Sequence, residues 1–193
     1  MVEKKTIEQL QSIAKEWLPP FILRQLRYAL GNETLFKGRF DTWADALACC
    51  SGYTSENILS KVIGATLKVK QGDALFERDS VLFFEPDYNW PLLTGLMLAA
   101  TKNNGQLNVL DFGGALGSVY YQNRHFLQSL QSTTWNIVEQ PNFVEAGRCY
   151  IHDDTLRFFN SIDECVKENS INAILLSSVL QYVQDIDYIF YMK

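Results

Sequence analysis

The sequence predicts an α/β protein in which a parallel, doubly wound sheet of about four strands follows a helical region. Short apolar segments alternate with helical segments from Gln106 onward, which is typical of strand–helix–strand units. A glycine-rich loop separates the first of these strands from its helix. Before Gln106, apolar residues recur at the spacing of one helical face. We therefore expect an N-terminal helical region over residues 1–105 and a sheet-forming domain over 106–193.

The first half of the chain is expected to be mostly helical. Apolar spacing and the helix-ending residues Pro19-Pro20, Gly31-Asn32 and Ser51-Gly52 predict helices over 6–17, 21–30, 41–50, 54–69 and 90–101. Asp41 is the expected N-cap of the third helix. A short strand is expected over 81–84.

In the second half, strands are predicted over 107–112, 135–139, 156–159 and 171–176. Helices are expected from about 118 to 130, over 141–150 and 162–168, and from Ser178 onward. The strand over 171–176 is expected at the buried centre of a parallel sheet. Right-handed crossovers would bring the carboxyl ends of all four strands to one edge.

Composition excludes several classes of function. Of the 193 residues, 47% are hydrophobic and 20% are charged, which favours a globular protein. No apolar run is long enough to cross a bilayer, and the first residues lack a signal peptide's apolar core, so we expect a cytoplasmic protein. The net charge of −5 and the absence of a Lys/Arg cluster argue against nucleic-acid binding.

Side-chain chemistry narrows the choice further. Four cysteines without metal-ligand spacing are expected to be reduced and mostly buried, and no metal site is expected. The only histidines are His125 and His152, and the GxSxG and HExxH motifs are absent. Classical hydrolases and zinc proteases are therefore disfavoured. His152-Asp153-Asp154 is interpreted as a polar loop rather than a metal site.

The strongest local signal is the segment Asp111-Phe112-Gly113-Gly114-Ala115-Leu116-Gly117. Glycines between a strand and a helix allow a ligand to approach the backbone and the helix N-terminus. The dinucleotide fingerprint requires a glycine where Phe112 stands, and the Asp111 carboxylate would repel a pyrophosphate. S-adenosylmethionine carries an ammonium and a sulfonium and no phosphate, so it suits this loop better. A strand-to-helix turn that uses glycine only for its geometry is the alternative.

Glu139 ends the second predicted strand, about 20 residues after the glycine loop, where an acidic residue can hold a ribose diol. A surface charge is the alternative for a lone strand-end glutamate.

Several segments together resemble class I S-adenosylmethionine-dependent methyltransferases, which have a Rossmann-like fold. They are Asp111–Gln122, Trp135–Gly147 and Ile174–Tyr182. These segments, with Phe76–Ser80 and Trp90–Leu93, are similar more narrowly to a family of bacterial methyltransferases often associated with surface-polysaccharide biosynthesis.

The resemblance implies a role for each matching residue. Asp111, Gly113 and Gly117 would line the methionine end of the cofactor, Gly114 beside them would also contact the cofactor, and Glu139 would hold the ribose hydroxyls. Asn160 would lie near the adenine, Ser177 and Ser178 beside the cofactor, and Gln181 and Tyr182 near the substrate. Ala115 replaces the middle glycine of the usual loop, which predicts a departure in loop geometry.

The implied reaction is direct methyl transfer to a small-molecule or saccharide acceptor. A general base is needed only for a hydroxyl or protonated amine, and Glu77, Asp79 and His125 are the candidates. A solvated turn for Glu77 and Asp79, and a helix-surface role for His125, are the alternatives.

The family's sheet normally has seven strands, whereas only four are predicted here. A truncated chain, a homodimer that covers the open edge and coverage by N-terminal helices are three explanations. The alternative functions are a non-catalytic module that binds cofactor or a partner chain, and a nicotinamide-dependent oxidoreductase.

Overall fold

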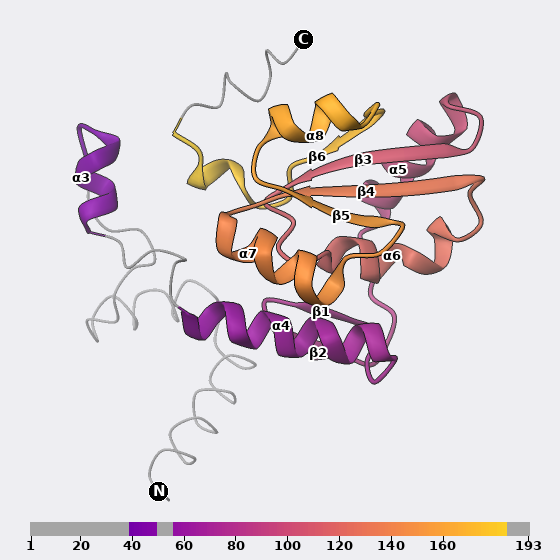
Figure 1. Cartoon of the computed structure of the whole chain (residues 1–193), viewed down its shortest axis with the longest axis horizontal. Coiled ribbons are helices and arrows are strands. Elements are labelled where there is room, and N and C mark those ends of the chain that lie inside the picture. The colour runs from indigo at the N-terminus through magenta and orange to yellow at the C-terminus, as the bar shows by residue number, and fades with distance from the viewer. Residues whose placement is uncertain (1–38, 50–55, 185–193) are drawn as a thin grey trace, which may run out of the picture. The chain divides into compact units, whose positions relative to one another are not determined.

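The computed structural model describes residues 39–49 and 56–184 and divides the chain into two compact units, Met1–Cys50 and Ser51–Lys193 (Figure 1). The described part of the first unit is helix α3 (Trp43–Ala48). Thr42 caps this helix, because its Oγ1 accepts a hydrogen bond of 3.2 Å from the Asp45 N–H. The expectation that Asp41 is the N-cap is therefore wrong by one residue. The helices expected over 6–17 and 21–30 lie outside the described residues.

The second unit contains both the sheet and the helices that precede it. Its elements are α4 (Glu56–Gln71), β1 (Phe76–Arg78), β2 (Val81–Phe83), α5 (Trp90–Lys102), β3 (Gln106–Phe112), α6 (Ser118–Leu127), β4 (Ser132–Val138), α7 (Pro141–Ala146), the π-helix η1 (Gly147–Ile151), β5 (Leu156–Phe159), α8 (Ile162–Glu168), β6 (Ala173–Leu175) and the 3-10 turn η2 (Leu180–Tyr182). The division between units falls at residues 50/51 rather than at 105/106, because α4 and α5 share their core with the sheet.

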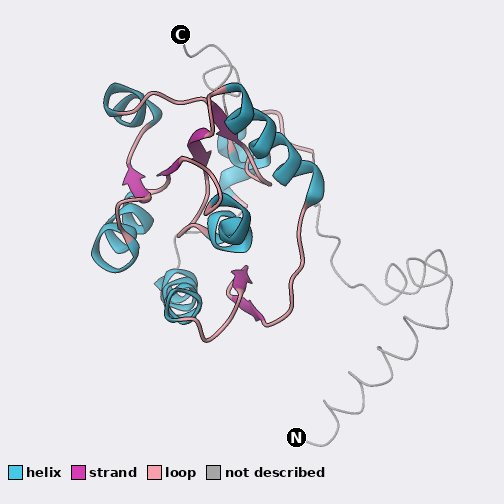
Figure 2. Cartoon of the chain, turned by 90° about the vertical axis from the view of Figure 1, so that its right-hand side faces the viewer, coloured by secondary structure: helices cyan, strands magenta, loops and turns pink. Residues whose placement is uncertain are grey.

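The expected α/β architecture with a four-stranded parallel sheet is confirmed. The strand order is β5-β4-β3-β6, and every neighbouring pair is parallel. In this register Asp111 on β3 lies opposite Ile137 on β4 and Leu175 on β6. The chain thus moves outward from β3 through β4 to β5 and then crosses to the other side of β3. Figure 2 shows helices on both sides of the strands.

A β-hairpin precedes the sheet, and the sequence predicts only its second strand. Phe76 on β1 pairs with Phe83 on β2, and their rings stack with centroids 4.6 Å apart. Asp79 and Ser80 form the connection with φ values of 52° and 67°, the left-handed conformations of a two-residue hairpin turn. Two of the three residues of β1, Glu77 and Arg78, are charged, whereas β2 is an apolar run of the same length, so only β2 has an apolar signal in the sequence.

The last strand differs from its expectation. β6 has only three residues and lies at one end of the described sheet, where the Ile174 side chain is 53% exposed. The preceding Asn172 instead bonds the start of β3: its Oδ1 accepts from the Asn108 N–H at 2.9 Å. The expectation of a buried central strand is therefore wrong. Of the helix expected from Ser178 onward, residues 178–184 form only the short 3-10 helix η2, and the remainder lies outside the described residues.

Alternation along the strands separates two apolar clusters. Leu107, Val109, Trp135, Ile137 and Leu156 join the cluster that includes residues of α4, α5, α6 and α7. Leu110, Val138 and Phe159 point the other way and pack with Ile162 and Cys165 of α8. Asp111 continues the first series, so its side chain points to the face that carries Trp135.

The expected burial of the cysteines and the expected absence of a membrane span can be compared with the described residues. Cys165 is buried, whereas Cys49 and Cys149 are exposed, so most of the described cysteines are not in the core. Within residues 39–49 and 56–184, no helix combines the length and apolarity that a membrane crossing requires.

Candidate functional site

Residues expected to bind a ligand gather at the carboxyl edge of the sheet, because all four strands end there (Figure 1). The glycine loop follows β3, Glu139 follows β4, Asn160 follows β5, and Ser177 and Ser178 follow β6. The order in which strands join the sheet reverses between β3 and β6: β4 and β5 lie on one side of β3, and β6 lies on the other. In open parallel sheets, ligands bind outside the strand ends at such a reversal point. The glycine loop and Ser177 flank this point.

The glycine loop turns sharply and keeps a glycine-type backbone at a residue that is not glycine. Gly113 has φ of 72°, and its N–H donates a 2.9 Å bond to the carbonyl of Val138. Ala115, which replaces the usual middle glycine, also has a positive φ of 50°. A left-handed alanine costs about 1 kcal/mol relative to its ordinary conformation. The loop therefore retains its bend at an energetic cost.

Asp111 lies beneath this loop in the protein interior. Its side chain is 1% exposed, and its Oδ2 accepts a 2.9 Å hydrogen bond from the indole Nε1–H of Trp135. Its Oδ1 has no hydrogen-bond partner within the described residues. A Cβ on Gly114 would overlap this carboxylate, so only glycine lets the loop cross it. Asp111 thus contacts the loop from below.

Burial changes the acidity of Asp111. Desolvation raises the pKa of this carboxyl from its ordinary 3.8 to about 7, against the opposing effect of the Trp135 hydrogen bond. The negative charge of Glu139 raises the pKa as well. The two carboxyl groups are therefore close enough to repel each other. We call this pair, Asp111 and Glu139, the acidic edge.

Glu139 connects the end of β4 to the glycine loop. The Gln140 N–H donates to its Oε2 at 2.6 Å, and the Ala115 N–H also donates to this carboxylate. Partial burial raises the pKa of Glu139 in spite of these bonds. Its contact with the loop argues against the alternative of a plain surface charge.

The segment after β6 covers part of the loop. A Cβ placed on Gly113 would overlap the Val179 side chain, so Val179 occupies the space directly over this glycine. Ser177, Ser178, Gln181 and Tyr182 are all exposed. The Gln181 Nε2 donates to the Ser178 carbonyl at 2.7 Å, which holds this side chain against its own backbone. A ligand at the loop would require Val179 to shift.

Asn160 is exposed at the end of β5. Its backbone N–H donates a 2.8 Å hydrogen bond to Glu164 Oε2, and Glu164 also pairs with Arg148 at 3.0 Å. The Asn160 side chain also hydrogen-bonds the Glu164 carboxylate, which lowers the pKa of Glu164.

The three candidate bases have different environments. Glu77 on β1 is 1% exposed; Ser118 Oγ donates to its Oε1, and the Ser80 N–H donates to its Oε2 at 3.0 Å. Desolvation raises its pKa. Asp79 is exposed in the hairpin turn, and His125 is exposed on α6. The solvated-turn interpretation thus describes Asp79 but not Glu77.

The contacts of Trp135, Ser118 and Val179 were not predicted from the sequence. Each of these residues reaches a site residue that is distant along the chain, and no local pattern signals such a pairing. Trp135 and Ser118 each lie in an expected element, but only the register of β3 against β4 and the hairpin's position beside α6 show what they touch.

Within the described ranges, no three His, Cys, Asp or Glu side chains gather as a metal site would require. Asp153 instead accepts hydrogen bonds from the N–H groups of Thr155 and Leu156, at 2.9 and 2.7 Å, in the loop before β5.

Comparison with models of known protein families, with curated proteins and with solved structures finds no match for this chain.

Proposed function

We propose that this chain binds S-adenosylmethionine at the acidic edge and acts as a methyltransferase of the class I, Rossmann-like type. The strand order β5-β4-β3-β6 corresponds to the first four strands of the doubly wound order 3-2-1-4. The single observation that carries the proposal is the contact between Glu139 and the left-handed Gly113–Ala115 turn, where the Ala115 N–H donates to the Glu139 carboxylate at the point where the strand order reverses.

Charge favours this cofactor over a dinucleotide. Two adjacent carboxyl groups with raised pKa values create a site that a cation stabilises and a pyrophosphate destabilises. The ammonium and sulfonium of S-adenosylmethionine meet that requirement. The left-handed turn at Gly113 and Ala115 supports close approach of a ligand to the backbone.

Each site residue would make its own contact with the cofactor. Gly113, Gly114 and Gly117 line the bend, and Glu139 accepts hydrogen bonds from the ribose hydroxyls. Asp111 supplies negative charge from beneath the loop. Asn160, Ser177 and Ser178 flank the same edge from the neighbouring strands.

The bound cofactor supplies an already activated methyl group, so the protein has mainly to align the acceptor and exclude water. Glu77 is a poor proton acceptor, because both of its oxygens already accept hydrogen bonds from Ser118 and Ser80. We propose a small-molecule or saccharide acceptor that approaches near Gln181 and Tyr182, and we assign no general base.

The Val179 side chain over the glycine loop favours one alternative function. Val179 fills the space over Gly113, and β6 has no neighbour on its outer side among the described strands. Both features are compatible with a non-catalytic module that binds the cofactor weakly or binds a partner chain. A homodimer that pairs the outer edges of β6 is the corresponding assembly.

Calorimetry with S-adenosylmethionine tests the proposal. We expect saturable binding that is tighter at pH 8 than at pH 6 and that releases a proton near pH 7, because a cationic ligand favours the ionised form of Asp111, whose pKa is about 7. Glu139→Gln should weaken binding at least tenfold, whereas Glu145→Gln, at an exposed position on α7, should not.

Val179→Ala should tighten binding if Val179 must move aside. Binding without transfer of a labelled methyl group to any saccharide or small-molecule fraction would favour the non-catalytic alternative. No binding to wild type or to Val179→Ala would exclude the methyltransferase and the cofactor-binding form of the alternative, and would leave the module that binds a partner chain. Tight NAD binding would favour an oxidoreductase.

A further inference from the structure

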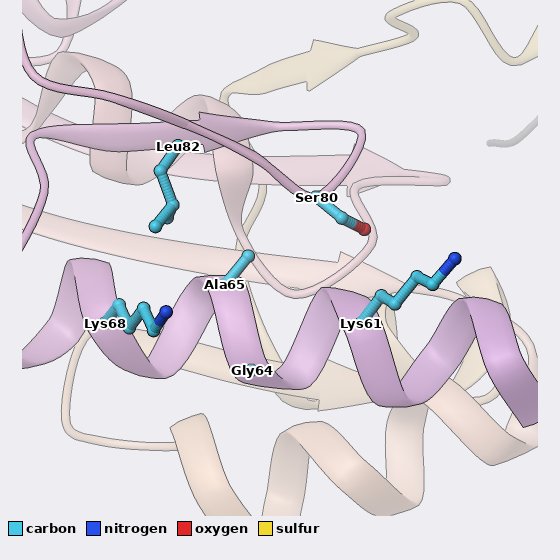
Figure 3. A pocket seen from close by; sticks show the side chains of 6 residues that line it. All are labelled: Lys61, Gly64, Ala65, Lys68, Ser80 and Leu82. Carbon is cyan, nitrogen blue, oxygen red and sulfur yellow. The ribbon is translucent and has the colours of Figure 1, made fainter. Parts of the chain in front are cut away.

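A hollow lies between helix α4 and the turn of the β1–β2 hairpin, separate from the residues of the acidic edge. Its volume is about 290 Å³, and its lining residues are Lys61, Gly64, Ala65, Lys68, Ser80 and Leu82 (Figure 3). We call it the basic hollow. Figure 3 shows Lys61 and Lys68 on α4 on either side of Gly64 and Ala65, with Ser80 and Leu82 reaching from the hairpin opposite.

Two small residues line the α4 wall of the hollow; in Figure 3 Ala65 lies on the side of the helix that faces the hairpin, and Gly64 on the opposite side. A Cβ on Gly64 would meet no atom within 4 Å, so this side of the helix is open. Ala65, the next residue, is buried, and Leu82 from β2 lies over it. A larger side chain at 65 would fill the space that Ala65 leaves.

The wall formed by the hairpin is held in place. Ser80 has φ of 67°, and its N–H donates a 3.0 Å bond to the buried Glu77 carboxylate. The same carboxylate accepts from Ser118, the first residue of α6. The turn that carries the Ser80 hydroxyl is therefore fixed to the unit's core and does not have to be ordered when a ligand binds.

The polar groups of the hollow are donors. Each lysine ammonium offers three donors and no acceptor, and neither Lys61 nor Lys68 has a hydrogen bond or ion pair with any described residue. The Ser80 hydroxyl is a further donor. The whole chain carries a net charge of −5, so two lysines without a partner among the described residues are not explained by a generally basic surface.

We propose that the basic hollow binds a phosphate group, free or esterified to a small metabolite, between Lys61, Lys68 and the Ser80 hydroxyl. Two ammonium groups match the charge of a phosphate dianion, and lysine is a common phosphate ligand. The volume lies at the lower end of the range for ligand pockets, which suits one phosphate or a small ester. This inference does not depend on the proposed methyltransferase function.

Titration of the full chain with inorganic phosphate, and separately with glycerol phosphate, tests the inference. Backbone amide NMR spectra at constant ionic strength, with chloride as the balancing anion, should show saturable shifts at residues 61–68 and 80. If either probe binds in this way, the proposal is supported; tighter binding of glycerol phosphate identifies an ester as the ligand.

Variants locate the binding. Lys61→Gln with Lys68→Gln should weaken binding at least tenfold, whereas the matched pair Lys102→Gln with Lys167→Gln, both exposed on α5 and α8, should leave it unchanged. Ala65→Leu keeps both charges but fills the hollow, and should also weaken binding tenfold. Absence of saturable shifts with both probes, or equal weakening by the two lysine pairs, would overturn the proposal.

Discussion

The acidic edge and the basic hollow differ in how far their charged groups are exposed to water. Asp111 and Glu139 lie partly or wholly out of water, and desolvation raises the pKa of both carboxyl groups. Lys61 and Lys68 remain exposed around an open hollow. A buried charge without a full set of partners destabilises the fold, whereas an exposed lysine interacts with water at little cost.

Because of this difference in exposure, ligand binding should depend on solution conditions differently in the two regions. A ligand at the acidic edge would relieve a destabilised pair of carboxyl groups, so binding there should be strongly linked to protonation. A ligand at the basic hollow would replace water around fully hydrated ammonium groups. Binding there should be sensitive to ionic strength instead.

The largest expected effect is on the pH dependence of stability. Asp111 binds a proton more tightly in the folded than in the unfolded chain, so its contribution to stability is present below pH 4 and is lost as pH rises toward 7. Asp111→Asn should therefore gain up to about 4 kcal/mol relative to wild type between pH 4 and pH 8. Urea unfolding across this range measures the difference. A matched Glu145→Gln variant should show no such trend.

Removing the indole partner of Asp111 should be the next largest change. Trp135→Phe deletes the Nε1–H donor and leaves space in a fully buried position, so we expect about 3 kcal/mol of destabilisation at pH 7. The pKa of Asp111 should rise further. Urea unfolding of Trp90→Phe is the control, because Trp90 is 58% exposed and should lose under about 1 kcal/mol. Equal losses would contradict the buried hydrogen bond.

The bond between α6 and the hairpin should be worth less. Ser118→Ala removes the hydroxyl that donates to buried Glu77, which should destabilise the chain by about 1–2 kcal/mol and raise the pKa of Glu77. Ser129→Ala, at an exposed hydroxyl that bonds the Phe126 carbonyl, should cost under about 0.5 kcal/mol in the same thermal unfolding measurement. A larger loss for Ser129→Ala would argue against a structural role of the Glu77 contact.

Two substitutions in the glycine loop should have opposite signs. Ala115→Gly relieves a left-handed alanine and should stabilise the chain by about 1 kcal/mol. Gly113→Ala should destabilise the chain, because the positive φ of residue 113 is unfavourable for alanine and the added Cβ would overlap the Val179 side chain. Thermal unfolding distinguishes the two. Destabilisation by both would mean that Ala115 has a contact that glycine cannot replace.

The smallest effect concerns the basic hollow. Gly64→Ala lies within α4 in open space, so higher helix propensity should stabilise the chain by about 0.5–1 kcal/mol. Gly95→Ala in α5, where added atoms also meet nothing within 4 Å, should give a similar gain by thermal unfolding. A loss for Gly64→Ala alone would show that the hollow is narrower than the structure indicates.

Much of the fold could be predicted because its signals are local. The alternation of strands and helices after Gln106, the glycine loop and the strand ending at Glu139 can all be read from neighbouring residues. Strand β1 was missed because two of its three residues are charged, so it lacks an apolar signal. A strand was expected where β6 lies, but its position at the end of the described sheet was not. The apolar composition around β6 suggested burial, but burial depends on which elements pack beside the strand.

For the candidate site, the sequence alone determined which residues lie at the carboxyl edge, because parallel strands joined by right-handed crossovers must end there. Only the tertiary structure decided what those residues touch: Trp135 beside Asp111, Val179 over Gly113, and Ser118 against Glu77. The basic hollow likewise requires α4 and the hairpin to face each other. Such contacts depend on packing between segments far apart in the chain, and desolvation at those contacts sets the pKa values that local sequence cannot encode.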